Sequence, residues 1–186
     1  MEFVEGVGRR TTFEDSDIVG WVKVGNNSLN GNENNVLLRS LGRSPMPAFV
    51  DAGYVSGADR IEDSRGVAAI DIEGDGDLDL IVQGVERPTV LLVNQGCPGT
   101  HWLQVRLRGT RSNRDAIGAR IEVRIGERML VREVTSTAGF ISGRSLMSHF
   151  GLGGATKVDS LTVHWPRGGS KTLTDVAVDQ RLTIVE

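Results

Sequence analysis

The chain has 186 residues and a formal net charge of −3 at pH 7, a size that suits one domain or two small ones with a real hydrophobic core. No apolar run approaches the roughly 20 residues that span a bilayer, so we predict no membrane span. The acidic balance, and aromatic side chains that are not interleaved with basic ones, exclude a typical nucleic-acid-binding protein.

Residues 1–33 match no pattern that assigns them to a fold. Their first ten residues, MEFVEGVGRR, contain neither a basic start nor an apolar stretch, so we expect no signal peptide, and a cytoplasmic location stays open. Residues 25–36 include six Asn around an Asn30-Gly31 pair. Because Asn and Gly tolerate positive φ, this segment predicts a loop or hairpin tip, with a polar ligand surface as the alternative.

Residues 34–99 contain a weak internal repeat. The segments NNVLLRSLG (34–42) and PTVLLVNQG (88–96) share V-L-L and a trailing Gly, with an offset of 54 residues. Such an offset is typical of repeated sheet units, for example propeller blades. A closed propeller needs about four blades or more, so a chain of this length predicts an incomplete ring with open strand edges. Open edges could pair with a second copy of the chain.

The most distinctive segment is DIEGDGDLDL (71–80), in which five of ten residues are acidic. The patterns RGVAAI before it and LDLIVQG after it predict a strand–loop–strand unit. Calcium takes 6–8 oxygen ligands, which a short loop supplies best from alternate residues. Glycines in the loop permit a sharp reversal around an ion. The candidate ligands are the carboxylates at loop positions 1, 3, 5 and 9 and the carbonyl at position 7: Asp71, Glu73, Asp75, Asp79 and Asp77.

A calcium ion is the favoured interpretation of this loop. The alternative is an acidic hairpin turn without an ion, in which the crowded carboxylates would repel one another. Mg²⁺ fits less well, because it prefers few carboxylates and retained waters. We expect direct ligation by Asp71, Asp75 and Asp79, with Glu73 and the Asp77 carbonyl as auxiliary ligands. Position 12 is a Val and not the bidentate Glu of an EF-hand, so the predicted affinity is weak.

The segment NQGCPGT (94–100) marks the predicted boundary between two parts. Residues 1–99 carry a net charge of −8 and residues 100–186 a net charge of +5. Gly, Pro and Asn occur together at this change of sign, which is typical of a linker. The single cysteine, Cys97, excludes an internal disulfide bond.

Strand patterns dominate residues 100–186. In WLQVRLRG (102–109), Leu, Val and Leu alternate with Gln, Arg and Arg, which predicts one apolar and one polar face. Residues 119–134 predict a hairpin that turns at Gly126-Glu127. Residues 159–165 and 180–186 predict two further strands, and a short helical turn is possible at 172–180. The predicted fold class is therefore all-β.

Three other groups of residues are candidates for function. Arginines are dense in the predicted hairpin and could bind an anion, although a solvated strand face paired with glutamates explains them better. Asp115, in the polar loop TRSNRDAIGAR, could act as a general acid or base near His149 or His164 if the fold gathers them. Neither histidine has a metal-ligand spacing with another His or Cys.

Two stretches resemble known families. RGVAAIDIEGDGDLDLIVQG resembles the calcium loop of FG-GAP/VCBS repeats, with Glu73 in place of the usual Asp or Asn. HWLQVRLRGTRSNRDAIGARIEV and the stretch from SHFGLGG to the last residue resemble the ASPIC/UnbV domain of the cartilage acidic protein-like family. The resemblance implies partial β-propeller blades at 34–99, a compact β-sandwich-like domain at 100–186, calcium in the blade loop and an extracytoplasmic location.

Three functions follow as hypotheses. The first is a non-catalytic, calcium-binding β-module for adhesion or ligand binding, whose partner is another protein or a polar, anionic or glycan ligand. The second is a small cyclase or isomerase acting on a natural-product intermediate, which the resemblance to enediyne-cluster proteins implies, with Asp115, His149 or His164 in acid–base roles. The third is a structural subunit that self-assembles through open strand edges.

Overall fold

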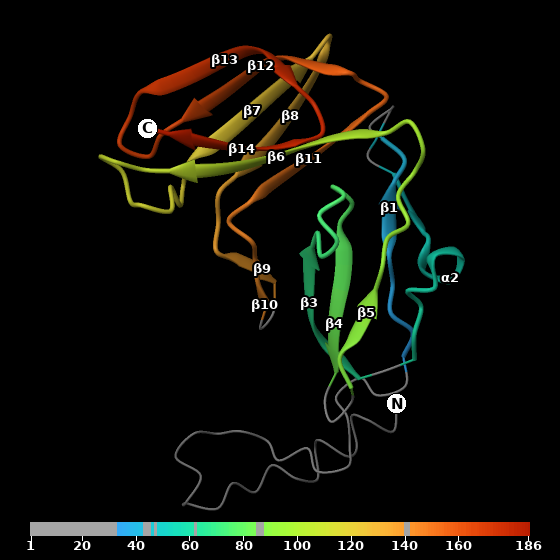
Figure 1. The fold of residues 1–186 in the computed structure, drawn as a ribbon. Coiled ribbons are helices and arrows are strands. Elements are labelled where there is room, and N and C mark those ends of the chain that lie inside the picture. Colours follow the sequence, from blue (N-terminus) through green and yellow to red (C-terminus); the bar gives the residue numbers. More distant parts are fainter. Residues whose placement is uncertain (1–32, 43–45, 47, 62, 85–87, 140–141) are drawn as a thin grey trace, which may run out of the picture. The chain divides into compact units, whose positions relative to one another are not determined.

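The structure is a computed structural model that describes residues 33–42, 46, 48–61, 63–84, 88–139 and 142–186 (Figure 1). The predictions for residues 1–32, including most of the Asn-rich segment, lie outside this part of the chain. The chain divides into two compact units, Met1–Ser64 with Gly84–Pro88, and Arg65–Gln83 with Thr89–Glu186. Strands account for nearly all of the regular structure, which confirms the predicted all-β class.

The described residues of the first unit form one short hairpin and one helical turn. Strand β1 (Leu38–Ser40) pairs antiparallel with β2 (Phe49–Asp51). The helix α2 (Gly53–Ser56) follows, and Asp51 Oδ1 accepts a hydrogen bond from the Gly53 N–H at 2.8 Å. The blade arrangement of this region stays a prediction.

The second unit begins with a three-stranded sheet of order β3-β4-β5. Its strands are β3 (Ser64–Ile70), β4 (Asp79–Gly84) and β5 (Val90–Leu92), and β4 pairs antiparallel with β5. The acidic segment connects β3 to β4, so the predicted strand–loop–strand unit is confirmed.

A second three-stranded sheet has the order β11-β6-β14. The central strand β6 (His101–Arg108) pairs antiparallel with β11 (Ser148–Gly153) and parallel with β14 (Gln180–Val185). The last strand of the chain therefore lies directly beside the first strand of the C-terminal half.

A four-stranded antiparallel sheet of order β13-β12-β7-β8 completes the second unit. Its strands are β7 (Arg120–Ile125), β8 (Arg128–Glu133), β12 (Lys157–His164) and β13 (Ser170–Ala177). Two very short strands, β9 (Thr137–Gly139) and β10 (Ser142–Gly143), pair with each other.

One hydrophobic core is built from both of these larger sheets. Leu103, Val105 and Leu107 on β6 are buried, as their alternation predicted. They join buried residues of the four-stranded sheet, including Ile121 on β7 and Leu161 on β12. Each such side chain contributes about 1.5–3 kcal/mol of burial free energy, so this core fixes the position of β6 and β14.

Most of the predicted strands in this half are confirmed, but the helical turn at 172–180 is wrong. Strand β13 occupies Ser170–Ala177 and pairs with β12 along its length. Leu173 and Val176 pack on the core three residues apart, a spacing that imitates a helix. Asp175 between them has a φ of 52°, and this local break in the extended backbone lets both side chains face inward.

Within the part of the chain that the structure describes, no helix is long and apolar enough to cross a membrane.

Candidate functional site

The acidic loop reverses the chain at two glycines. Gly74 and Gly76 have φ angles of 81° and 97°, in the left-handed region that L-residues with a side chain rarely adopt. Gly76 meets a second constraint, because a Cβ atom there would overlap with the indole ring of Trp102 on β6. The predicted role of these glycines in a tight reversal is confirmed, and the loop packs closely on β6 at Gly76.

Asp71, the first acidic residue, organises the backbone of the loop. Its Oδ1 accepts a hydrogen bond from the Gly74 N–H at 2.6 Å, and its Oδ2 accepts one from the Gly76 N–H at 3.1 Å. Asp75 acts in the same way over a shorter span, with its Oδ1 3.0 Å from the Asp77 N–H. The chain therefore wraps around the Asp71 carboxylate, which gives the loop a defined shape.

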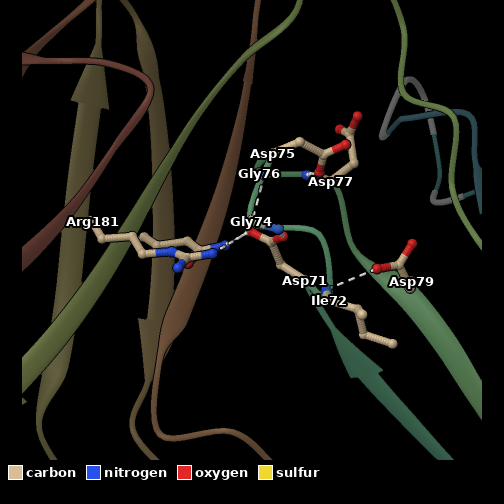
Figure 2. A network of polar contacts seen from close by, with 9 residues as sticks. Asp71, Ile72, Gly74, Asp75, Gly76, Asp77, Asp79 and Arg181 are labelled. Atoms are coloured by element: carbon tan, nitrogen blue, oxygen red, sulfur yellow. Dashed lines mark hydrogen bonds and ion pairs between the residues drawn. The ribbon is translucent and has the colours of Figure 1, made fainter.

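Asp79 braces the other end of the loop. Its side chain is buried, at 1% exposure. Its Oδ2 accepts a hydrogen bond from the Ile72 N–H at 3.0 Å, drawn in Figure 2, and its Oδ1 accepts one from the Asn94 N–H at 2.9 Å. Because Ile72 starts the loop and Asn94 follows β5, one carboxylate ties together three segments of the β3-β4-β5 sheet region.

Arg181 on β14, shown in Figure 2, bonds to Asp71 from the side of the C-terminal strands, and Gln104 on β6 does the same. Arg181 Nη2 and Gln104 Nε2 donate to Asp71 Oδ2 at 3.0 and 2.7 Å, and Arg181 Nε donates to Gln104 Oε1 at 3.0 Å. Burial acts to raise the pKa of Asp71, but the bonds from Arg181, Gln104 and the two glycine N–H groups outweigh it and hold that pKa below its usual value.

Glu73 reports the electrostatic balance of the loop. Its pKa is raised, first by loss of solvent and then by the carboxylates of Asp79, Asp75 and Asp71. Among the described residues, the one cation that pairs with a loop carboxylate is Arg181. Five carboxylates lie within nine residues, so a surplus of negative charge remains after that pair is counted.

The acidic side chains do not converge on one point. No group of three or more His, Cys, Asp and Glu side chains that could hold a metal ion occurs in the described ranges. Asp71 turns toward Arg181 and Asp79 reaches back to the Ile72 backbone (Figure 2). The donors are hard oxygens, the type that calcium prefers, but binding requires these carboxylates to move toward one another.

The three residues considered for acid–base catalysis lie apart. Asp115 is exposed in the loop between β6 and β7, and His164 is exposed at the end of β12, with its Nε2 3.6 Å from Glu122 Oε2. His149 is half-buried on β11 and lines a cavity with Asp71. No bond between any two of Asp115, His149 and His164 occurs among the described residues, and their catalytic roles stay a prediction.

Sequence reasoning missed three residues that position the loop. Gln104 belongs to the polar face of β6 that the alternation predicted, yet it is buried at 4% exposure, because Asp71 and Arg181 bond to it. Arg181 and Trp102 likewise act on a loop that is distant in sequence. In the sequence, the signal for such a residue was the cluster of carboxylates itself, which predicts that a positively charged side chain lies close to it in the fold.

The C-terminal part of this arrangement corresponds to a known domain. Residues 109–186 match the ASPIC and UnbV family model. The match confirms this part of the resemblance seen in the sequence and extends from the loop before β7 to the last residue. Arg181 therefore lies within the residues that match this family model, whereas its partner Asp71 precedes them. No curated protein matches the chain closely enough to count as a relative.

Proposed function

We propose that the loop of residues 71–79 binds one Ca²⁺ ion and that the chain is a calcium-dependent, non-catalytic β-module for ligand binding or adhesion. The observation that carries this proposal is the uncompensated charge of the loop. Arg181 pairs with Asp71 alone, and the pKa of Glu73 is raised in part by three neighbouring carboxylates. A divalent cation is the simplest species that removes this repulsion.

The ligands would come from alternate residues of the loop. Asp71, Asp75 and Asp79 would supply carboxylate oxygens, and Glu73 and the Asp77 carbonyl would complete the set. Asp71 already bonds to Gly74 and Gly76, so the backbone there is pre-organised. When bound, the ion supplies two positive charges and links both ends of the loop.

The expected affinity is weak. The loop has no bidentate Glu at position 12, and extracellular calcium modules without dense ligation bind with Kd values of about 10⁻⁴–10⁻³ M. Such a site is filled where calcium is millimolar, which agrees with an extracytoplasmic location. Because only the folded loop presents the ligands, the binding free energy adds to folding stability.

Thermal unfolding with and without calcium tests the proposal. At a calcium concentration of about 100 times Kd, the ion should stabilise the folded chain by about 2.7 kcal/mol. For a chain of this size that corresponds to a rise in Tm of about 5–10 °C relative to EGTA. Mg²⁺ at the same concentration should give a much smaller rise.

Two single substitutions separate a loop effect from a general ionic effect. Asp75→Asn keeps an acceptor for the Asp77 N–H but removes a ligand charge, so it should abolish most of the calcium-induced rise. Asp115→Asn removes the same charge from an exposed residue elsewhere and should leave the rise unchanged. Equal Tm values in EGTA and in calcium at about 10–100 mM, which is about 100 times the expected Kd, or an unchanged rise in Asp75→Asn, would contradict the proposal.

A further inference from the structure

A cavity of about 490 Å³ lies beside the acidic loop in the second unit. One part of its wall is apolar and includes Ile70, Leu78 and Met147. The rest is polar and includes three arginines. Pockets for small molecules have volumes of about 300–1,000 Å³ and combine apolar walls with a few placed polar groups, so this cavity has the right size and character.

The wall carries more positive than negative charge. Its arginines are Arg132, Arg144 and Arg181, and its acidic residue is Asp71. Arg181 is already committed to Asp71 and Gln104. Within the described residues, the guanidinium groups of Arg132 and Arg144 form no ion pair. Two arginines are therefore available for a ligand.

Arg132 is held in place by its surroundings. Its guanidinium lies over the Phe150 ring, 5.6 Å from the centroid, and its Nη1 donates to the Val131 carbonyl at 3.0 Å. Contact with an aromatic face and a backbone bond restrict the side chain and leave its other N–H groups free to donate. An arginine that is fixed in this way loses less conformational entropy when it binds an anion.

His149 adds a polar group that lacks a partner. Its Nδ1 is buried and forms no hydrogen bond with any described residue. Burial and the nearby Arg132 charge lower its pKa, so the ring is neutral at pH 7 and can either donate or accept. Because Nδ1 itself is closed to solvent, a ligand in the cavity would meet the accessible part of the His149 ring and not this nitrogen.

We propose that this cavity binds a small molecule that combines a carboxylate or phosphate group with a compact apolar body. Arg132 and Arg144 receive the anionic group, because guanidinium forks match both anions. The apolar body packs on Ile70, Leu78 and Met147. This inference rests on the ligand-binding part of the proposed function and specifies the ligand. Binding of the anion by the two arginines does not require the calcium ion.

The test is an NMR titration of the isotope-labelled chain with four probes. Benzoate and phenyl phosphate carry an anion on an aromatic ring, benzamide is the neutral analogue, and inorganic phosphate has no apolar body. Each is titrated at constant ionic strength in EGTA and again in calcium. We expect saturable shifts at the cavity for benzoate, phenyl phosphate or both, and at least tenfold weaker binding of benzamide and inorganic phosphate. Tighter binding of benzoate would identify the anionic group as a carboxylate, and tighter binding of phenyl phosphate would identify it as a phosphate.

Three variants assign the effect to the cavity. Arg144→Gln removes a guanidinium that forms no ion pair with any described residue, while the Arg144 backbone N–H still donates to the Ser136 carbonyl, and Arg132→Gln removes the second guanidinium. Each should weaken anion binding at least tenfold, since a charge-assisted hydrogen bond to the anion is lost. Arg114→Gln changes an exposed arginine outside the cavity wall and is the matched control.

The outcomes separate this proposal from the calcium proposal. Anion binding in EGTA that is lost in Arg144→Gln supports the cavity even where calcium does not bind. Binding of benzamide as tight as benzoate, equal affinity in Arg144→Gln and Arg114→Gln, or no saturable shift in the unmodified chain overturns it. The spectrum of each variant shows directly whether it is folded.

Discussion

Two regions of the second unit hold carboxylates with backbone N–H groups, and they differ in how much negative charge remains uncompensated. At the C-terminal end, Glu186 Oε2 accepts hydrogen bonds from the N–H groups of Thr110, Arg111 and Ser112 at 2.9, 2.7 and 2.8 Å, and Oε1 accepts one from Ser112 Oγ at 3.0 Å. In the acidic loop, Asp71 likewise accepts bonds from Gly74 and Gly76.

The two regions differ in how many carboxylates share the available backbone N–H donors. The donors of residues 110–112 serve one carboxylate, and the Ser112 N–H and its neighbours lower the pKa of Glu186 to about 2. In the loop, backbone N–H groups donate to Asp71, Asp75 and Asp79, and Glu73 and Asp77 add two further charges. The pKa of Glu73 is accordingly raised. A backbone nest compensates one anion, whereas the loop keeps a surplus of negative charge, which the proposed Ca²⁺ ion would remove.

The largest expected effect comes from changing Gly76 to Ala, which breaks the loop and leaves the Glu186 nest intact. A Cβ atom would be strained at a φ of 97° and would overlap with the Trp102 ring, so we expect a loss of about 3 kcal/mol in unfolding free energy. Gly126→Ala is the control, because Gly126 also has a positive φ but has open space around it. It should cost about 1 kcal/mol in the same urea-unfolding experiment. Equal losses would show that packing on Trp102 is unimportant.

Replacing Glu186 with Gln tests whether the N–H groups of residues 110–112 stabilise the charged carboxylate, because the effect should then depend on pH. The folded-state pKa of about 2 lies below the ordinary 4.5, so this carboxylate adds stability above pH 4.5 that is lost as the pH falls toward 2. The Gln variant should therefore melt several degrees below the unmodified chain at pH 6, with a gap that closes toward pH 2. Thermal melts across this range measure the gap. A gap independent of pH would mean that the charge of Glu186 is not what the nest recognises.

The smallest of these effects, and the most informative for the loop, is that of Arg181→Gln. Arg181 is half exposed and its pair with Asp71 should contribute about 1 kcal/mol, so the variant should be slightly less stable in EGTA. Removing this positive charge should also raise the calcium affinity severalfold, since the guanidinium and the ion compensate the same carboxylates. Calorimetric titration measures the affinity. Weaker calcium binding in the variant would indicate that Arg181 serves the metal site by positioning Asp71.

Local patterns predicted much of the fold and only part of the site. The alternation of Leu103, Val105 and Leu107 predicted the inner face of β6, because the side-chain period of a strand is two. The same reasoning failed at β13, where the left-handed Asp175 places Leu173 and Val176 on the core at a helical spacing. One residue with an unusual φ was enough to change the period.

The acidic loop shows the same limit for function. Its glycines and the spacing of its carboxylates predicted a tight reversal, and the φ angles of Gly74 and Gly76 confirm it. The guanidinium that neutralises Asp71 comes from a residue 110 positions away, which no local pattern identifies. Of the arginines that line the cavity, Arg132 belonged in the sequence to a dense run of arginines without a distinguishing feature, and Arg144 lies outside that run.

Terbium luminescence measures most directly whether the loop holds a cation. Tb³⁺ occupies calcium sites, and the Trp102 indole lies against Gly76, so excitation of that ring should sensitise an ion bound in the loop. We predict emission that saturates at one ion per chain, is displaced by Ca²⁺, and is lost in Trp102→Phe and strongly reduced in Asp75→Asn. No sensitised emission, or emission that persists unchanged in Asp75→Asn, would contradict a calcium site in this loop.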